Sequence, residues 1–333
     1  MTAYTHDANQ NLASNHDAAA RSRRLSGLGF ALLSAASFGL AGSLAKGLLD
    51  AGWTAGAAVT ARILLAAAVL SIPSILALRG RWALLRQNWK LLAAYGAFAV
   101  AGCQLAFFNA VGRMEVGVAL LIEFTSPVAV IGWMWFRHHQ RPGGLTVVGA
   151  LLAAMGLVLV LDLVSGADID TLGVLWALGA MAGAAVYWVL SADESNGLPP
   201  IVLAGGGLLA GGLILLLAGL VGIVPFEAPL TDVTFVDAVV PWWVPIVGLG
   251  VVTAALAYVL GIAAGRRLGS RLASFMGLME VVAALVFAWL LLGQAPAPVQ
   301  LAGGALILLG VIVVKSGERS AADAPMEPLQ GRT

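Results

Sequence analysis

Ten apolar stretches, each about as long as a membrane-spanning helix, dominate this sequence of 333 residues. A helix needs about 20 mainly apolar residues to cross the hydrocarbon core of a bilayer, and only helices and closed barrels satisfy their backbone hydrogen bonds there. The stretches are continuous rather than alternating, which indicates helices. The predicted spans are residues 27–48, 54–78, 90–110, 115–137, 143–162, 171–191, 199–222, 242–264, 270–292 and 296–315.

Composition supports the same fold class and excludes several functions. The apolar set makes up 60% of the residues and charged residues only 11%, against about 25% charged residues in a typical soluble domain. A soluble chain of this length has no way to bury so much apolar surface, so a soluble enzyme or a nucleic-acid-binding protein is excluded. The sequence predicts an all-α integral membrane protein with ten transmembrane helices, surrounded by membrane lipid.

The basic residues outside the spans predict the orientation of the chain. Fifteen of the 18 lysine and arginine residues lie in the two tails and in the loops after the second, fourth and eighth spans. With ten spans these segments share one side, which the positive-inside rule assigns to the cytoplasm. The opposite loops are acidic and carry one basic residue, Arg113. We therefore expect a multi-pass protein of a bacterial-type inner membrane with both termini in the cytoplasm.

The two halves of the sequence repeat one another. Each half holds an odd number of spans, so the second half enters the membrane from the opposite side and the repeat is inverted. Inverted repeats are typical of secondary transporters, whose substrate site lies near the bilayer midplane between the halves. The matching residues are Ala110–Arg113 over Ala263–Arg266 at an offset of 153, Gly149 and Gly156 over Gly303 and Gly310 at an offset of 154, and Gly39 over Gly183 at an offset of 144.

This repeat divides the chain into four segments. Two five-helix repeats are expected at residues 26–165 and 166–315, between polar and disordered cytoplasmic tails at 1–25 and 316–333. The basic stretch Arg21–Arg24 would also suit the start of a cleaved signal peptide. The first span is needed to complete the first repeat, so we favour a retained helix.

Several short motifs resemble one transporter family. They are Ser43–Lys46, Thr60–Leu64, Gly117–Pro127, Met276–Glu280, Leu291–Gln294 and Pro298–Leu301. With these motifs the chain resembles the EamA-type branch of the drug/metabolite transporter superfamily, and within it the threonine/homoserine exporter group. Two positions depart from the family pattern, because Val281 stands where the family usually has proline and Gln294 where it usually has an acid.

The resemblance implies a fold and a function. The family has ten helices in two inverted five-helix halves, and the exporter group moves small amino acids outward, while exporters of aromatic amino acids lie in the same superfamily. We expect a secondary transporter of small amino acids, threonine-like or broader, working by alternating access. The alternative is a multidrug or general metabolite exporter of the same fold. The sequence does not determine which substrate is carried. It also does not distinguish proton coupling from facilitated diffusion, or a monomer from a homodimer.

Three charged residues lie well inside predicted spans: Arg62, Glu123 and Glu280. A charge near the bilayer centre costs about 2.5–3.5 kcal/mol on insertion scales, so it usually faces protein or water and marks a pathway. Arg62 and Glu123 each lie eight residues from the external start of their span, about 12 Å deep at about 1.5 Å per residue. Equal depth and opposite charge predict an Arg62–Glu123 ion pair, which would either stabilise the bundle or also bind substrate.

Glu280 lies about 15 Å deep in the ninth span, near the midplane. No cationic residue of the second half has a matching depth, and a buried carboxylate without a partner tends to hold a proton. Three roles remain open for Glu280: a proton-coupling group, a ligand for the ammonium group of a substrate, or a carboxylic acid bonded to a backbone carbonyl.

Uncharged side chains in the spans extend the candidate site. Tyr187, Tyr258, Asn109 and Phe38 are candidates to line a substrate cavity, although tyrosines in spans also bond neighbouring helices. Lys46 is a weaker candidate, because a lysine at the end of a span often reaches to the interface. Four tryptophans, Trp133, Trp135, Trp242 and Trp243, are expected in the interfacial belt.

Catalytic and cofactor motifs are missing from the spans. The histidines lie in the tail and in one predicted loop, and the single Cys103 excludes an intramolecular disulfide or a cysteine metal cage. No P-loop, phosphate-binding glycine motif or Ser/His/Asp set occurs. We therefore expect no enzyme activity, no cofactor and no metal, and a small molecule rather than a nucleic acid as partner.

Overall fold

The structure is a computed structural model, which describes residues 2–126, 143–160, 170–192, 196–261, 263–264, 267 and 279–322. The helices of the first part are α1 (Thr2–Asp50), α2 (Ala55–Leu78), α3 (Ala83–Gln87), α4 (Trp89–Ala94), the π-helix η1 (Tyr95–Gly102), α5 (Cys103–Val111), α6 (Val116–Glu123) and α8 (Gly144–Val160). Those of the second part are α9 (Thr171–Ala192), α10 (Pro200–Leu220), α11 (Trp243–Val247), the π-helix η2 (Gly248–Leu256), α13 (Met279–Leu292) and α14 (Pro298–Ala322).

The described part of every predicted span is largely helical. Five helices are long and apolar enough to cross a membrane: Leu25–Asp50, Ala55–Leu78, Trp89–Val111, Pro200–Leu220 and Trp243–Gly261. Shorter apolar helices cover Val147–Leu159, Thr171–Tyr187, Met279–Leu292 and Pro298–Gly310. Of the predicted spans 115–137 and 270–292, large parts lie outside the described residues, so the number of ten spans stays a prediction.

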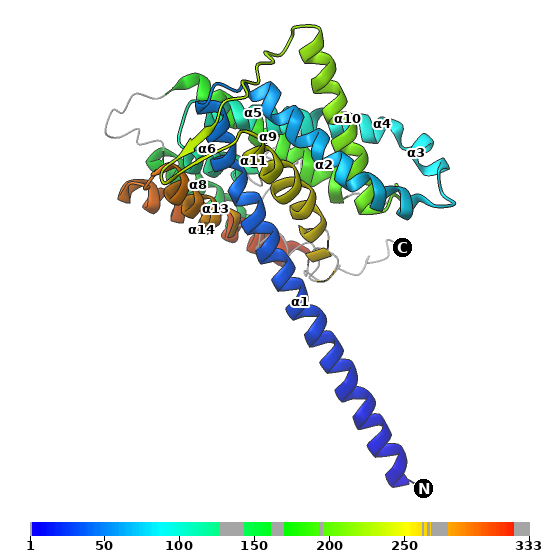
Figure 1. The fold of residues 1–333 in the computed structure, drawn as a ribbon. Helices are drawn as coiled ribbons and strands as arrows, with labels where there is room; N and C mark the ends of the chain where they lie inside the picture. The colour runs from blue at the N-terminus through cyan, green and yellow to red at the C-terminus, as the bar shows by residue number, and fades with distance from the viewer. Residues whose placement is uncertain are drawn as a thin grey trace, which may run out of the picture.

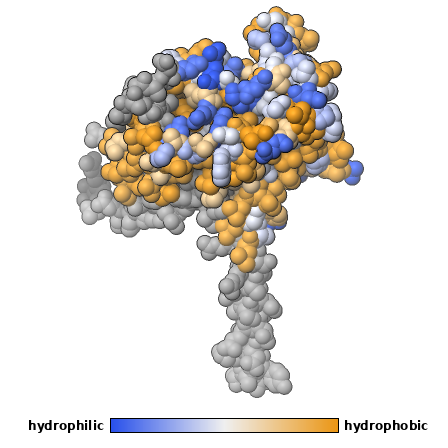
Figure 2. Space-filling view, turned by 60° about the vertical axis from the view of Figure 1, so that its left-hand side comes forward, coloured by the Kyte–Doolittle hydropathy of each residue, from blue (hydrophilic) through white to orange (hydrophobic). Residues whose placement is uncertain are grey.

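The surface of the helical body is apolar. Large apolar side chains are exposed along α8, α10 and α13, among them Leu151, Leu217 and Trp289. Figure 2 shows apolar residues over most of the coloured face, with hydrophilic residues gathered toward the end opposite the projecting N-terminal helix. Such a surface is stable against lipid tails rather than water, so the protein is a multi-span membrane protein.

Several of the extensive helix contacts form a symmetric pattern. Helix α8 packs on α14 and α2 on α10, while α1 packs on α13 and η2, and α9 packs on α6 and η1. If each helix is replaced by its counterpart in the other half, these two contacts of α1 become the two contacts of α9. The α8–α14 and α2–α10 pairs each join a helix to its own counterpart, so the replacement leaves them unchanged. In Figure 1, α8, α13 and α14 lie on one side of α1, and α2 and α10 lie on the other.

Two π-helical segments occupy matching positions in the two halves. An offset of 153 residues carries the start of η1 at Tyr95 onto the start of η2 at Gly248. A π-helix widens the backbone and is found mostly at functional sites. Hydropathy does not encode this widening, so the sequence predicts these segments only as parts of ordinary helices.

Glycines allow α8 and α14 to approach closely. A methyl group on Gly156 would lie 2.5 Å from the Gly303 carbonyl oxygen, and one on Gly310 would lie 2.6 Å from the Gly149 carbonyl oxygen. These are the four glycines that the repeat superposes at an offset of 154. Small residues at such contacts let helix backbones pack directly in a membrane.

We expect Gly310→Ala to lower the free energy of unfolding by about 1–3 kcal/mol. The new methyl group would meet backbone atoms of α8, which cannot move aside as the end of a flexible side chain can. Gly304→Ala in the same helix is the control, since its methyl group would lie at an ordinary 3.4 Å from Leu121. Thermal unfolding of the purified variants measures the difference. Equal unfolding temperatures for the two variants would show that the glycine contact is not required.

The prediction of an all-α protein needs one correction. Between α10 and α11 the chain forms a small antiparallel hairpin of β1 (Val233–Phe235) and β2 (Ala238–Val240), with Val233 opposite Val240. Valine, threonine and phenylalanine favour strands, and this connection is too short and polar to form another span. Phe235 and Val233 pack on Gly47 of α1, so the hairpin covers one end of the helical body.

The chain before this hairpin also pairs with the α1–α2 connection. Thr54 Oγ1 donates a hydrogen bond to the Pro225 carbonyl at 2.8 Å and accepts one from the Glu227 amide at 3.0 Å. Trp53 Nε1 donates to the Pro229 carbonyl at 2.9 Å. Trp242 stacks on Trp53 with ring centroids 6.0 Å apart, so it packs on this connection as well as lying at the end of its span.

The N-terminal segment differs from the predicted disordered tail. Helix α1 begins at Thr2 and continues without a break to Asp50, and Figure 1 shows its first part extending beyond the helical body. A helix satisfies its own backbone hydrogen bonds, so it can extend past the residues that pack. Helix α14 likewise extends to Ala322, into the predicted C-terminal tail.

Candidate functional site

The guanidinium group of Arg62 lies inside the helical bundle. The side chain is 4% exposed, and its Nη2 atom donates a hydrogen bond of 3.0 Å to the backbone carbonyl of Thr253 in η2. The guanidinium carbon also lies 5.6 Å from the centroid of the Phe108 ring. Helix α2 is thus joined to η2 of the other half by a hydrogen bond from a charged group.

The predicted Arg62–Glu123 ion pair is wrong. Among the described residues the two ion pairs within 4.0 Å are Lys46–Asp50 and Arg113–Asp170. Residue counting gives the depth of a side chain but not the direction in which it leaves its helix, and Arg62 turns toward η2. The two charges still interact electrostatically, and Arg62 interacts in the same way with Glu280. The three intramembrane charges therefore form one cluster without direct contact.

Glu123 is the last residue of α6. A turn at Phe124 and Thr125 follows it, just before Pro127, where the sequence predicts a continuous span. The thiol of Cys103 lies 3.6 Å from Glu123 Oε1 and 3.4 Å from the Ala180 carbonyl oxygen. This thiol connects α5, α6 and α9 beside the carboxylate.

Glu280 lies in the first turn of α13, against α1. A methyl group on Gly39 of α1 would lie 2.9 Å from the Glu280 backbone oxygen, so the two helices touch here. Within the described part of the chain, the Glu280 carboxylate has no hydrogen bond and no ion pair. Its charge interacts at longer range with Glu123 and Arg62.

Aromatic side chains form a row across the bundle. Phe38 of α1 meets Tyr258 edge-on with ring centroids 5.3 Å apart, and Tyr258 meets Tyr187 of α9 in the same way at 6.3 Å. Tyr187 in turn lies 6.0 Å from Tyr95 of η1. Tyr258 also interacts electrostatically with Arg62, which places the row beside the charged cluster. Three of the predicted cavity residues are thus brought together.

Two predicted site residues lie apart from this cluster. Lys46 forms an ion pair of 2.9 Å with Asp50, one turn further along α1, near the end of the helix. Asn109 donates its side-chain hydrogen bond to the Leu105 carbonyl of its own helix at 2.8 Å. The structure gives neither of them a contact with Arg62, Glu123 or Glu280.

Three buried polar atoms have no hydrogen-bond partner among the described residues: Ser43 Oγ, Arg62 Nε and Gln104 Oε1. Buried polar atoms are nearly always paired in folded proteins, so an unpaired set calls for a physical explanation. A polar ligand or water in the bundle would supply the missing partners. No group of three or more His, Cys, Asp or Glu side chains suited to a metal ion occurs in the described ranges.

Sequence reasoning missed three residues of the site: Cys103, Thr253 and Tyr95. In the sequence analysis Cys103 excludes only a disulfide and a cysteine metal cage, although a single cysteine in a span next to polar residues is a signal of its own. Tyr95 had the same signal as the other span tyrosines. Nothing in the sequence marks the Thr253 carbonyl as an acceptor, because that role depends on the packing of α2 against η2.

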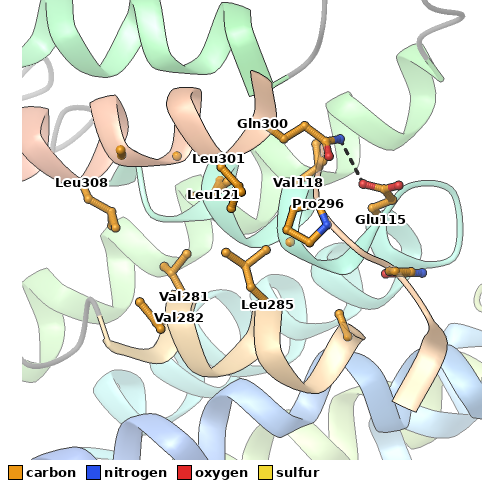
Figure 3. Close-up of a pocket in the computed structure, with 15 residues that line it drawn as sticks. Glu115, Val118, Leu121, Val281, Val282, Leu285, Pro296, Gln300, Leu301 and Leu308 are labelled. Carbon is orange, nitrogen blue, oxygen red and sulfur yellow. Dashed lines mark hydrogen bonds between the residues drawn. The ribbon is translucent and has the colours of Figure 1, made fainter. Parts of the chain in front are cut away.

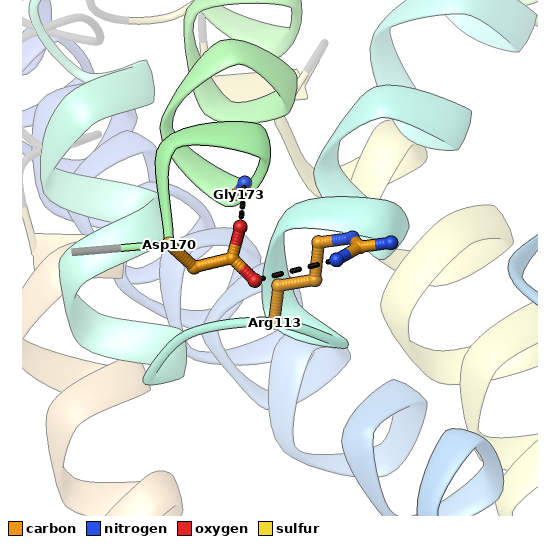
Figure 4. Close-up of polar contacts among 3 residues, drawn as sticks. All are labelled: Arg113, Asp170 and Gly173. Atoms are coloured by element: carbon orange, nitrogen blue, oxygen red, sulfur yellow. Dashed lines mark hydrogen bonds and ion pairs between the residues drawn. The ribbon is translucent and has the colours of Figure 1, made fainter. Parts of the chain in front are cut away.

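A second polar contact lies at one end of the bundle. Arg113, in the turn between α5 and α6, forms an ion pair of 3.3 Å with Asp170 at the start of α9 (Figure 4). The other carboxylate oxygen of Asp170 accepts a hydrogen bond of 2.9 Å from the Gly173 amide and so caps α9. The Gly173 amide and the Arg113 guanidinium together hold the pKa of the Asp170 carboxyl below its usual value of 3.8.

We expect acid to destabilise the protein in part through Asp170. A group whose pKa is lowered by folding stabilises the fold above its usual pKa, and this contribution is lost as the pH falls through the folded-state value. The unfolding temperature of the wild type should therefore fall more steeply below pH ~4 than that of Asp170→Asn. Asp232→Asn is the control, since Asp232 is exposed, and its acid dependence should match the wild type. Identical curves for all three proteins would contradict a role for this contact.

Comparison with known proteins places these features in a family. The profile of the EamA-like transporter family matches the chain twice, at residues 25–162 and 171–316. The threonine/homoserine exporter RhtA of Escherichia coli (strain K12) is 29% identical over 231 residues, which cover 68% of this chain and 69% of the relative. The uncharacterized inner membrane transporter YicL of Salmonella typhimurium is 25% identical over 235 residues, covering 68% of this chain and 74% of the relative.

One solved structure supports the fold. It is described only as the crystal structure of a protein, and it covers 90% of this chain and 99% of its own with a TM-score of 0.55 at 22% identity. At this identity the likeness shows the fold alone. The two family matches together cover most of the chain, and the resemblance to threonine/homoserine exporters rests on relatives at modest identity. The chain belongs to the EamA-like transporter family.

Proposed function

We propose that this protein is a secondary transporter that exports small amino acids across the inner membrane by alternating access between two inverted halves. The observation that carries the proposal is the buried cluster of Arg62, Glu123 and Glu280, in which one basic and two acidic side chains lie near one another without forming an ion pair among the described residues. Charges kept apart inside a membrane protein are suited to a ligand that carries both signs. The family membership supports transport, and the exporter relatives support outward movement of threonine or homoserine.

The cluster offers complementary groups to a zwitterion. The Arg62 guanidinium uses Nη2 for the Thr253 carbonyl, while its Nε has no hydrogen-bond partner among the residues that the structure describes. A guanidinium binds a carboxylate through two parallel hydrogen bonds, so we assign the substrate carboxylate to Arg62. The carboxylates of Glu123 and Glu280 then remain for the substrate ammonium group, and Glu280, which has no hydrogen bond or ion pair among the described residues, is also the candidate for exchanging a proton.

The aromatic row gives the substrate side chain an apolar wall. Phe38 lies on α1, Tyr258 on the helix that continues η2, and Tyr187 on α9. Both halves therefore contribute to this wall. A wall of this kind accepts small aliphatic side chains and larger aromatic ones. We therefore propose a range that includes threonine-like substrates and extends to broader ones.

The symmetric packing supports alternating access. The exchange of halves preserves several of the helix contacts, the two π-helices coincide under one offset, and the two family matches divide the chain between α8 and α9. In inverted-repeat transporters one half rocks against the other around a fixed midplane site. The Arg113–Asp170 contact lies at the end that we assign to the outside, where it would close the inward-facing state.

Counterflow in proteoliposomes tests this proposal. Vesicles loaded with one unlabelled amino acid should accumulate the labelled amino acid, and a panel that covers threonine, homoserine and aromatic amino acids would define the range. The same panel with and without a pH gradient separates proton exchange from facilitated diffusion. The proposal would be overturned if no amino acid showed counterflow while a cationic drug or another metabolite was transported.

The second candidate is a multidrug or general metabolite exporter of the same fold. The row of four aromatic rings favours it, because aromatic faces bind flat apolar and cationic molecules. This candidate predicts that drug transport persists after substitution of Arg62. The amino-acid proposal predicts that transport requires the guanidinium.

A further inference from the structure

An apolar cavity, whose lining includes none of the three intramembrane charged residues, lies between α6, α13 and α14 (Figure 3). It has a volume of about 270 Å³. Its walls are aliphatic, and its polar residues gather at one end. The aliphatic residues include Val118 and Leu121 of α6, Val282 and Leu285 of α13, and Leu301 and Leu308 of α14.

Three small residues, Gly117, Gly304 and Ala305, belong to the lining of the cavity. A methyl group on Gly117 would lie 2.5 Å from Leu285, whereas one on Gly304 would lie at an ordinary 3.4 Å from Leu121. Ala305, also in the lining, is exposed, as are Val282 and Leu301. The cavity therefore opens through α13 and α14 to the lipid-facing surface of the bundle.

The polar end of the cavity is held by a network of hydrogen bonds. Gln300 Nε2 donates to Glu115 Oε2 at 3.0 Å, and the Val116 amide donates to Gln294 Oε1 at 3.3 Å. The Glu115 side chain is exposed beside this network, and its second carboxylate oxygen accepts no hydrogen bond from the described residues. The carboxylate gives this end a negative charge.

We propose that the cavity binds one acyl chain of a phospholipid whose headgroup carries an ammonium group. The aliphatic walls match the chain, and the carboxylate of Glu115 matches the ammonium group. At about 270 Å³ the cavity is slightly below the roughly 300 Å³ at which pockets for whole small molecules begin, which suits part of one chain. The lateral opening gives a lipid direct access from the bilayer.

The position of the cavity connects it to transport. Leu121 precedes Glu123 by two residues on α6, and Val281 follows Glu280 on α13, and both line the cavity. A chain between these helices sets their separation, so its presence should change the transport rate without contacting the substrate. This link rests on the proposed function, whereas lipid binding itself does not.

Photolabelling of the full-length protein in nanodiscs tests the binding. The probe is phosphatidylethanolamine with a diazirine in its acyl chain, and the labelled peptides are identified by mass spectrometry. We expect labelling of the cavity residues to fall about tenfold in Ala305→Trp, which fills the opening, and to stay unchanged in Ala302→Trp. Ala302 is an exposed alanine of the same helix outside the cavity, so the two substitutions are matched.

Other outcomes decide against the proposal. Equal labelling in both variants, or labelling spread evenly over the lipid-facing surface, would overturn it. Loss of the label on addition of a saturating transported substrate would also overturn it, because the cavity would then belong to the transport path. If Ala305→Trp does not fold, Gly304→Leu fills the cavity from a neighbouring position and should give the same loss.

The headgroup is tested with a second probe. We expect the phosphatidylethanolamine probe to label the cavity more strongly than a phosphatidylglycerol probe with the same chain. Glu115→Gln keeps an oxygen for Gln300 but removes the charge, and it should abolish this difference. Glu227→Gln, at an exposed acid of the segment before the hairpin, should preserve it. Equal labelling by the two probes in the wild type would contradict the assigned headgroup.

Discussion

Arg62→Lys should reduce amino-acid counterflow by about 100-fold, or about 2.7 kcal/mol, while the protein still folds. The guanidinium donates to the Thr253 carbonyl through one nitrogen and keeps another donor, Nε, without a partner in the described part of the chain. An ammonium group preserves the charge, but it cannot hold that carbonyl and present a planar pair of donors to a carboxylate. The loss should therefore appear in transport rather than in the unfolding temperature.

Arg79→Lys is the matched control for this prediction. Arg79 follows directly after the last residue of α2, where it is exposed, so its substitution should change neither transport nor stability. Counterflow and thermal unfolding are measured on the same preparations of the three proteins. Wild-type counterflow in Arg62→Lys would exclude the guanidinium as the carboxylate ligand. Unfolding of Arg62→Lys at a much lower temperature would assign Arg62 to the stability of the bundle.

Glu280→Gln is expected to separate exchange from proton coupling. Among the three intramembrane charges, Glu280 is the one without a hydrogen bond or ion pair in the described part of the chain, so neighbouring groups fix its charge state least. Glutamine preserves the shape of the side chain and cannot exchange a proton. We expect substrate exchange at equal pH to persist and the stimulation by a pH gradient to disappear.

Glu123→Gln is the control for Glu280→Gln. Its amide oxygen can still accept the hydrogen bond of the Cys103 thiol, so it should retain the stimulation by a pH gradient. Full gradient dependence in Glu280→Gln would show that Glu280 is not the coupling group. Loss of exchange at equal pH would instead assign Glu280 to the substrate ammonium group. Failure to fold would assign it a structural role.

The sequence predicted the features that depend on composition and period. Apolar length located helices in all described spans, and the cost of burying charge identified Arg62, Glu123 and Glu280, which the structure brings into one cluster. Phe38, Tyr187 and Tyr258 were identified as span aromatics and form contacts in the structure. These features depend on whether a residue type is more stable against lipid or inside protein, and each residue carries that property independently of its neighbours.

Features that depend on direction around a helix were not predictable. Depth along the membrane normal suggested an Arg62–Glu123 ion pair, but the azimuth of Arg62 depends on how α2 packs against η2. The π-helices and the Thr253 acceptor are backbone features without a side-chain signal. The hairpin at Val233–Val240 lies in a connection that is too short to form a span, so the hydropathy pattern gives no signal for it.

The most direct test of the account compares three substrates that differ by one charged group. Counterflow of threonine is measured beside 1-aminopropan-2-ol, which lacks the carboxylate, and 3-hydroxybutyrate, which lacks the ammonium group. A site that binds both charged ends should reject each analogue by at least about 100-fold, because a buried charged group would be left without a partner. Counterflow of either analogue at the rate of threonine would contradict the proposed site.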